Sequence, residues 1–292
     1  MNVNKWLGEN TESLKGKRVA VSGSTGGIGV RLCGYLAQLG ADLIFLDRNP
    51  KKVNGLREEI LSKSPKTKTD YIKLDLEDFE SVKEATETLK EKCPDIIIFN
   101  AGAYSIPRHK CSTGFDNVFQ INFVSPYYIA RELFPILKAK NGKIVAVGSI
   151  AHNYSKTDMT DVDFSTRKKA SLVYGNAKRF LMFSLLQFFK NENGLSIVHP
   201  GITFTNITAH YPKLIFAIIK HPMKIIFMKP KIACLSILKG VFENCGRNEW
   251  IGPRIFNVWG KPLKQRLKTC SAEEQKRIFR VAEEIYKDLK LR

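Results

Sequence analysis

With 292 residues, 43% of them hydrophobic, the chain can bury one large core, and one α/β domain is favoured over two. Its six cysteines form no C-x-x-C pair, the N-terminus has no apolar signal core, and no apolar run could span a bilayer, so we expect reduced thiols and a cytoplasmic protein. The net charge of +19 favours an anionic membrane, nucleic acid or an acidic substrate, but no nucleic-acid-binding module is recognisable and we expect no such partner.

Apolar runs and helical patterns alternate along the chain. Strands are predicted at residues 18–22, 43–46, 71–74, 96–99, 143–147, 195–198 and 249–251. Helices are predicted at residues 27–39, 51–63, 77–92, 114–139 with a bend near Pro126, 171–190, 231–245 and 272–290. We therefore expect a single domain over residues 1–292, an α/β, Rossmann-like, doubly wound parallel sheet flanked by helices. Its additions are a leader at 1–16, a helical substrate lid at 203–230 and a C-terminal helix within 270–292.

The first strand runs into a glycine-rich turn that extends from Gly23 to Gly29, and a helix follows it. A strand, a glycine turn and a helix in this order place backbone N–H groups and a helix N-terminus against a phosphate. We expect Gly23 to permit the tight bend, Gly27 to let the backbone approach a pyrophosphate, and Gly29 to let the helix pack on the strand. The spacing is not G-x-G-x-x-G, and a plain loop is the alternative.

Polar side chains end several of the predicted strands, namely Asp47, Asp75, Asn100 and Ser149. In an open parallel sheet, ligands bind outside the carboxyl ends of the strands, so these side chains are expected beside the glycine turn.

Tyr174 and Lys178 are four residues apart on a predicted helix and therefore share one face. A nearby ammonium favours the phenolate of a tyrosine, so a buried pair of this kind can act as a tuned proton donor and acceptor. Such pairs also occur by chance on many helices. The pair here follows five predicted βα units and lies about one helix beyond Ser149, which favours a catalytic role.

Seven short motifs occur in one order along the chain: Gly23-x-x-x-Gly27-Ile28-Gly29, Asp75-Leu76, Asn100-Ala101-Gly102, Asn122, Ser149, Tyr174-x-x-x-Lys178 and Pro200-Gly201. On these motifs, residues 15–205 resemble the short-chain dehydrogenase/reductase family, in particular its simple single-domain branch that includes retinol and steroid dehydrogenases. The resemblance implies that Tyr174 is the general acid/base, and that Lys178 lowers its pKa and holds the nicotinamide ribose. It further implies that Ser149 binds the substrate oxygen and that Asn122 supports a water relay.

The resemblance also implies an NAD(P) cofactor. The residues expected to contact it are Gly23, Ser24, Thr25, Gly27, Ile28, Gly29, Asp47, Arg48, Asp75, Leu76, Asn100, Ala101, Gly102, Tyr174, Lys178, Pro200, Gly201 and Thr203. Several have simpler alternatives. Asp75 could cap a helix, Asn122 could be satisfied within its own helix, and the Asn100 and Pro200 motifs could be plain turns.

The preferred cofactor depends on two adjacent residues with opposite charges. Asp47 lies at the end of the second strand, where a carboxylate binds the ribose 2′-OH and repels a 2′-phosphate. Arg48 follows it, and an arginine there can clamp that phosphate. We favour NAD(H) over NADP(H), because Asp47 would have to turn away for a 2′-phosphate to fit.

Residues 211–230 are strongly apolar but carry four lysines, and Pro222 interrupts them. The segment could be a lid packed on an apolar pocket with its lysines on the surface, or it could lie on an anionic membrane. Either interpretation predicts an apolar alcohol or ketone as substrate. The wider region from Tyr211 to Lys268 holds twelve Lys/Arg and two acids, and a solvated basic face explains this equally well.

We thus predict an NAD(P)-dependent oxidoreductase, in a homo-oligomer as is common in the family. A non-catalytic nucleotide sensor on the same fold is one alternative, against which the intact Ser149, Tyr174 and Lys178 argue. A sugar-nucleotide epimerase or dehydratase is another, since the Gly26–Gly27 doublet also fits that branch. We predict no metal, because the five histidines have no ligand spacing; His152 is the one closest to a motif.

Overall fold

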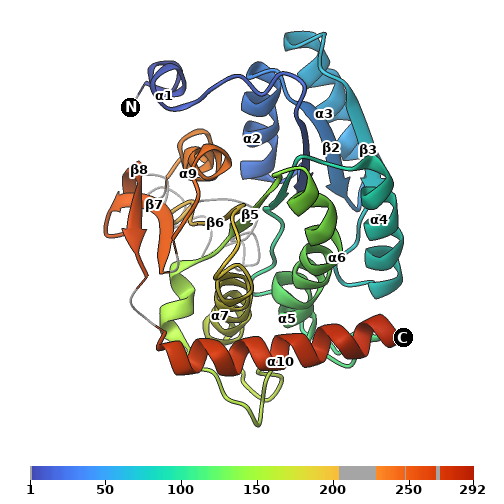
Figure 1. Ribbon diagram of the computed structural model, residues 1–292, viewed down its shortest axis with the longest axis vertical. Helices are drawn as coiled ribbons and strands as arrows, with labels where there is room; N and C mark the ends of the chain where they lie inside the picture. The colour runs from blue at the N-terminus through green and yellow to red at the C-terminus, as the bar shows by residue number, and fades with distance from the viewer. Residues whose placement is uncertain (1, 204–227, 247, 268–269) are drawn as a thin grey trace, which may run out of the picture.

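The computed structural model describes residues 2–203, 228–246, 248–267 and 270–292, and they contain one eight-stranded sheet (Figure 1). The strands are β1 (Arg18–Ser22), β2 (Asp42–Asp47), β3 (Thr69–Lys73), β4 (Ile96–Phe99), β5 (Lys143–Val147), β6 (Leu195–Val198), β7 (Glu249–Ile255) and β8 (Trp259–Arg266). Their spatial order is β3-β2-β1-β4-β5-β6-β7-β8, parallel except for the antiparallel pair β7–β8. The chain reverses its direction of winding between β1 and β4, and in such sheets the crevice at this point binds ligands.

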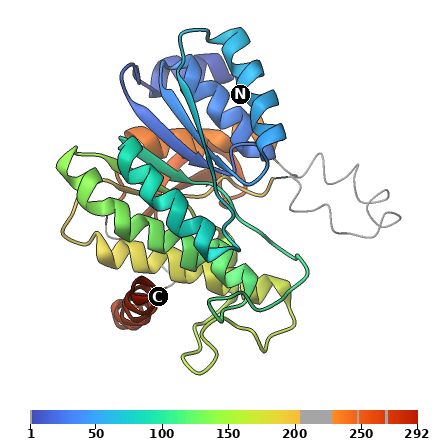
Figure 2. The ribbon, with the colours of Figure 1, turned by 90° about the vertical axis from the view of Figure 1, so that its right-hand side faces the viewer.

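Helices cover both faces of the sheet (Figure 2). They are α1 (Val3–Asn10), α2 (Gly27–Gln38), α3 (Pro50–Lys63), α4 (Phe79–Lys92), α5 (Asn117–Phe119), α6 (Ser125–Ala139), α7 (Ala170–Phe188), α9 (Pro230–Phe242) and α10 (Ala272–Leu291). The core around α1, α2, α3 and α9 lies on one face, and that around α4, α6, α7 and α10 on the other. Strand β1 shows why: Val19 and Val21 face the first core, and Ala20 between them faces the second.

The helix predicted at residues 114–139 is divided into three parts. Residues 114–116 lie outside it, since Asp116 caps α5 by accepting a hydrogen bond from the N–H of Val118 at 3.0 Å. A π-helical turn, η1 (Gln120–Val124), separates α5 from α6, and Pro126 lies in the first turn of α6. A proline is tolerated in a first turn because its missing N–H would have no helical partner there, so the irregularity comes before Pro126 rather than from it.

The sheet extends further than the sequence predicted. The last predicted strand, residues 249–251, is longer, and β8 returns beside it as a hairpin. Phe256 and Asn257 form the turn with φ of 51° and 57°, values typical of tight hairpins. β8 lacks alternating apolar residues and contains Pro262, which is tolerated because β8 is an edge strand.

A pair of glycines in α2 predicts opposite stability effects for one substitution. A Cβ at Gly29 would lie 2.1 Å from the carbonyl oxygen of Gly23, whereas a Cβ at Gly34 would meet no atom within 4 Å. We expect Gly29→Ala to lower the free energy of unfolding by more than about 2 kcal/mol, because backbone must move. Gly34→Ala should raise it by up to about 1 kcal/mol through helix propensity. Urea denaturation of both variants checks this, and equal effects would contradict it.

Within the described ranges, no helix is both long and apolar enough to cross a lipid bilayer.

Candidate functional site

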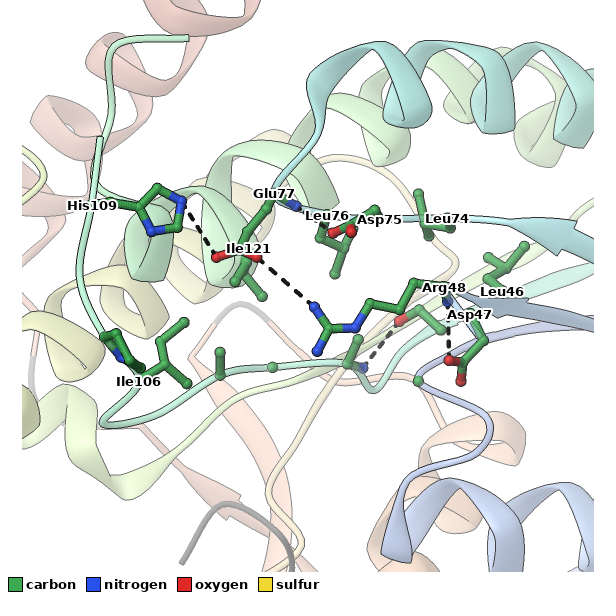
Figure 3. Close-up of a pocket in the computed structure, with 16 residues that line it drawn as sticks. Leu46, Asp47, Arg48, Leu74, Asp75, Leu76, Glu77, Ile106, His109 and Ile121 are labelled. Carbon is green, nitrogen blue, oxygen red and sulfur yellow. Dashed lines mark hydrogen bonds and ion pairs between the residues drawn. The ribbon is translucent and has the colours of Figure 1, made fainter. Parts of the chain in front are cut away.

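Two adjoining cavities of about 530 and about 430 Å³ lie at the carboxyl ends of the central strands. Figure 3 shows the first of them, which the end of β2 and the segment after β3 line from one side and the segment after β4 from the other. The residues common to both cavities are Gly23, Asp47, Arg48, Ala101, Gly102, Ala103 and Ile106. The second cavity adds the glycine turn, including Thr25, Gly27, Ile28 and Gly29, at the N-terminus of α2. Three of the four predicted strand ends, Asp47, Asp75 and Asn100, therefore meet the glycine turn in one crevice, whereas Ser149 lines neither cavity.

Asn100 fastens the end of β4 to the glycine turn. Its side-chain amide donates to the carbonyl oxygens of Ser22 and Gly23, both at 3.1 Å. The hydroxyl of Ser22 accepts in return from the backbone N–H groups of Asn100 and Ala101, at 3.1 Å each. These four bonds hold the two central strands, β1 and β4, together at the switch point.

Asp47 is held against the glycine turn. Its Oδ2 accepts from the backbone N–H of Thr25 at 3.0 Å and from the Thr25 hydroxyl at 2.8 Å, with Ser24 Oγ at 3.4 Å. Its Oδ1 accepts from the backbone N–H of Arg48 at 3.0 Å. Because both oxygens are engaged, turning this carboxylate away from the crevice would break several hydrogen bonds.

A second acidic residue, Glu77, lines the first cavity (Figure 3). Glu77 lies 3.9 Å from the guanidinium of Arg48 and 3.8 Å from Nε2 of His109, and it accepts from the Asn117 amide at 2.8 Å. Arg48 is 69% exposed, so its ion pair is weak.

The helix-cap alternative for Asp75 is wrong. The cap of α4 is Asp78, which accepts from the N–H of Glu80, whereas Asp75 accepts from the N–H of Glu77 at 3.1 Å. Asp75 and Leu76 both line the first cavity.

Tyr174 and Lys178 lie on one face of α7, as their spacing predicts. The ammonium of Lys178 is 5.7 Å from the centre of the Tyr174 ring and donates to the carbonyl oxygen of Val147 at 2.9 Å. Lys178 is buried, with 2% of its surface exposed, while Tyr174 is half-buried and packs edge-on against Tyr104. The Lys178 amine therefore lies near the Tyr174 ring and is more deeply buried than it.

The pKa values of this pair are governed by burial. Burial lowers the pKa of Lys178 to about 7, because few groups near the amine compensate its charge. Burial raises the pKa of Tyr174 to about 12, partly opposed by a hydrogen bond from Ser149. Burial therefore dominates the pKa of Tyr174, and the expected lowering by the ammonium does not appear in it.

Ser149 and Tyr174 are brought together by a close helix approach. Ser149 begins the 3₁₀ turn η2 (Ile150–Tyr154), and a Cβ at Gly175 would lie 2.3 Å from the carbonyl oxygen of Ala151 in that turn. Only a glycine beside Tyr174 allows α7 to pass so near η2. His152 fixes the turn: its Nδ1 lies 2.6 Å from the carbonyl oxygen of Ser149, and burial lowers its pKa to about 4, so the ring is neutral.

Asn122 lies in the π-helical turn η1, and its side chain and that of Lys178 both lie beside Gly102. Its amide donates to the carbonyl oxygens of Ala103 and Val118, both at 2.8 Å, so it is satisfied partly within its helix and partly outside it. Its Oδ1 is buried without a partner among the described residues. A Cβ at Gly102 would lie 2.8 Å from this oxygen and 3.5 Å from the Lys178 nitrogen. The Asn122 oxygen and the Lys178 amine thus both lie beside Gly102, where a water molecule could bridge the two groups.

A buried ion pair ties the η2 turn to the C-terminal helix, which crosses α7 in Figure 1. Arg179, 3% exposed, donates to Glu274 through two nitrogens at 2.9 and 2.7 Å, and to the His152 carbonyl oxygen at 3.1 Å. Sequence patterns give no sign of this pairing, because its partners are 95 residues apart.

Glu274→Gln should therefore be strongly destabilising. We expect the free energy of unfolding to fall by about 3 kcal/mol, because the arginine loses its counter-charge in a buried place. Glu273→Gln is the matched control, since Glu273 is exposed on the same helix and should change stability by less than about 0.5 kcal/mol. Urea denaturation at neutral pH measures both; a loss below about 1 kcal/mol at position 274 would contradict the assignment.

Only part of the predicted lid is described. Pro200 and Gly201 are buried, and Thr203 forms an isolated parallel bridge with Met228. Residues 204–227 lie outside the described residues, so the structure gives no account of the lid or of His210 and His221. Among the described residues there is no group of three His, Cys, Asp or Glu that could hold a metal ion.

Some lining residues were missed by the sequence analysis. Tyr104, Ile106 and His109 come from the segment after β4, and Glu77 follows Asp75 by two residues. None belongs to a recognisable motif, and only the path of the segment brings them to the crevice.

Comparisons with known proteins agree with this geometry. The family model described as short chain dehydrogenase matches residues 17–165. The chain is 31% identical over 222 residues to the short-chain dehydrogenase TIC 32 A, chloroplastic, of Brassica napus, covering 68% of each protein. It is 28% identical over 202 residues to retinol dehydrogenase 12 of Mus musculus, covering 67% of this chain and 64% of that one. An uncharacterised protein of Mycobacterium paratuberculosis superposes with a TM-score of 0.75 at 20% identity, covering 96% of both chains.

Proposed function

This chain belongs to the short-chain dehydrogenase/reductase family, and from that premise we propose that it reduces or oxidises an apolar alcohol or ketone. The residues that we expect to assist this reaction are Tyr174, Lys178, Ser149 and Asn122. Members of the family are oxidoreductases that act on CH–OH or C=O groups with NAD(P), and this protein is one of them. The observation that carries the proposal is the buried amine of Lys178, which lies 5.7 Å from the ring centre of the half-buried Tyr174.

The crevice suits a dinucleotide. The glycine turn presents backbone N–H groups at the N-terminus of α2, and Asp47 stands at the end of β2 where a ribose hydroxyl would bind. The unpartnered Asn122 Oδ1 and the small Gly102 leave polar space beside Lys178. When bound, the nicotinamide supplies the hydride chemistry.

The residues of this chain then handle the oxygen and its proton. Reduction of a carbonyl leaves an alkoxide-like oxygen, to which Ser149 and Tyr174 can both donate hydrogen bonds. Tyr174 delivers its proton to that oxygen, and in the oxidative direction it accepts one. Lys178 holds the cofactor ribose and, with Asn122, restores the proton through water.

The apolar substrate is inferred from two observations. The lid sequence at 203–230 is apolar, and a retinol dehydrogenase is among the relatives. We further propose a cytoplasmic homo-oligomer whose residues 211–230 touch an anionic membrane, from their apolar and basic composition.

A substrate screen tests the proposed function. Purified protein is offered a series of apolar alcohols, aldehydes and ketones with NAD and NADP in both redox states, and nicotinamide absorbance is followed. We expect turnover that rises with the apolar length of the substrate. Turnover of polar sugars or sugar nucleotides alone would contradict the substrate class, and cofactor binding without any turnover would favour a sensor.

We propose that NAD(H) is preferred. The two cavities together hold the carboxylates of Asp47, Asp75 and Glu77 and the cations of Arg48 and Lys52, and a 2′-phosphate would add negative charge beside these carboxylates. Because Asp47 is fastened to Thr25, it is not free to turn away.

Asp47→Ser should shift this preference. We expect the ratio of kcat/KM for NADP to that for NAD to rise by about ten- to hundredfold, because a carboxylate a few ångströms from the phosphate is removed. Arg48→Ala should lower the ratio, and Lys51→Ala, whose exposed side chain lies outside both cavities, serves as the control. A ratio unchanged in Asp47→Ser would place the discrimination elsewhere.

A further inference from the structure

The β7–β8 hairpin exposes four large apolar side chains. Phe256 is 84% exposed at its turn, Ile255 is 50% and Leu263 is 48% exposed, and Trp259 is 39% exposed opposite Ile255. The other large hydrophobic residues that are exposed in the described chain are Tyr154, Met159 and Leu291, which belong to other segments. Soluble surfaces rarely gather apolar groups this way without a partner.

Basic side chains lie along the same hairpin, from Arg254 and Lys261 near its turn to Arg266, which pairs with Glu249 at its far end. Arg254, Lys261, Lys264 and Arg266 are all exposed on the hairpin. The acid of the hairpin is Glu249 at its far end, whose Oε2 accepts from the N–H of Gly246 at 2.7 Å. Apolar side chains framed by cations are the pattern of surfaces that bind anionic lipid headgroups.

The hairpin adjoins the substrate end of the crevice. A Cβ at Gly201 would lie 2.8 Å from the carbonyl oxygen of Val258 and 3.0 Å from Pro253, so the hairpin packs directly on the Pro200–Gly201 turn. Thr203 follows two residues later. The hairpin lies at the opposite edge of the sheet from β3 in Figure 1, away from the expected adenosine end.

We propose that this hairpin docks on an anionic phospholipid bilayer, with Phe256 among the headgroups and Lys261 and Lys264 against the phosphates. A second copy of the chain is the less favourable occupant. A twofold interface would bring the same four cations of each copy together, with repulsion that a lipid phosphate layer does not impose. The hairpin residues are not part of the segment 211–230, and the proposal holds whatever reaction the crevice performs.

Trp259 provides an internal reporter, since the other two tryptophans, Trp6 and Trp250, are each only 3% exposed. The full chain is titrated with phosphatidylcholine vesicles that contain phosphatidylserine, and with phosphatidylcholine vesicles alone. We expect a blue shift of the tryptophan emission and quenching by brominated lipid with the anionic vesicles. Both effects should be largely lost at high salt, because the attraction is screened.

Two hairpin variants locate the contact. Phe256→Asn keeps a residue that tolerates the positive φ of the turn, and should weaken vesicle binding at least about tenfold. Lys261→Gln with Lys264→Gln should weaken it about 25-fold, at about fivefold per charge. The matched controls on α10 are Leu291→Ser and the pair Lys276→Gln with Lys287→Gln, which should change binding less than about twofold.

Three results would overturn the proposal. The first is no vesicle binding at low salt. The second is binding that the hairpin variants leave unchanged, which would assign the lipid contact to another segment such as 211–230. The third is a dimer in sedimentation that Phe256→Asn converts to a monomer, which would assign the hairpin to a second copy. None of these readouts depends on turnover, so failure here is distinguishable from failure of the proposed reaction.

Discussion

Replacing Tyr174 by phenylalanine is expected to lower kcat/KM by about 10³- to 10⁴-fold while cofactor affinity changes less than about threefold. The substitution removes one hydroxyl, and with it the proton donor and acceptor beside Ser149. The ring and its edge-on contact with Tyr104 at 5.3 Å remain, so the crevice should keep its shape. Steady-state kinetics and fluorescence titration of the reduced cofactor measure the two quantities separately.

Tyr154→Phe is the matched control, because Tyr154 is 56% exposed at the end of η2 and should tolerate the loss of its hydroxyl. A Tyr174→Phe enzyme that keeps more than about a tenth of the wild-type activity would refute the proton-transfer role. If the protein were a non-catalytic nucleotide sensor, neither variant would alter cofactor binding, and the wild-type protein would turn over no substrate.

Lys178→Met is expected to abolish turnover and yet to stabilise the protein near neutral pH. The buried amine has its pKa lowered to about 7, and each unit of such a shift corresponds to about 1.4 kcal/mol lost from folding. Methionine fills a similar volume without a charge, although the Val147 carbonyl oxygen loses its partner at a cost of about 1–3 kcal/mol. We expect a net gain of about 2 kcal/mol at pH 7.

The stability gained by Lys178→Met is expected to depend on pH. In the wild-type protein the unfolded chain keeps the Lys178 proton up to about pH 10.5, while the folded chain loses it near pH 7. Between these values the unfolded state binds more protons, so wild-type stability rises with pH. The advantage of Lys178→Met should therefore be full below about pH 7 and vanish or reverse by about pH 10. Urea denaturation across this range checks it, and an advantage independent of pH would contradict the buried charge.

Much of the fold was predictable because local patterns determine it. The buried parallel strands are continuous β-branched and apolar runs, as Ile96–Phe99 shows, and the helices carry apolar residues on one side. The glycine turn was predictable for the same reason. Gly29 has no room for a Cβ, so the residue type itself indicates the contact.

The parts that were missed depend on distant residues. β8 is an edge strand that pairs only because β7 precedes it in a hairpin, and its own sequence resembles a basic loop. The ion pair of Arg179 with Glu274 joins two helices that no spacing rule connects. The π-helical turn that holds Asn122 has no sequence signature comparable to a proline.

For the candidate site, the sequence predicted positions better than electrostatics. Asp47, Asp75, Asn100 and the glycine turn line the crevice, and Tyr174 and Lys178 share one face of α7. The direction of the tyrosine pKa could not be predicted, because it depends on how deeply the pair is buried. The sequence indicates that an amine is near but not how little water remains around it.

Transfer of deuterium from a nicotinamide labelled at the hydride position tests the central claim most directly. Wild-type protein, Tyr174→Phe and an apolar aldehyde found in the screen are incubated with the labelled reduced cofactor, and the alcohol is analysed by mass spectrometry. The account predicts one deuterium on the carbinol carbon with the wild-type protein and almost none with the variant in the same time. Label transfer at equal rates in both, or cofactor that binds without passing label to any carbonyl compound, would contradict it.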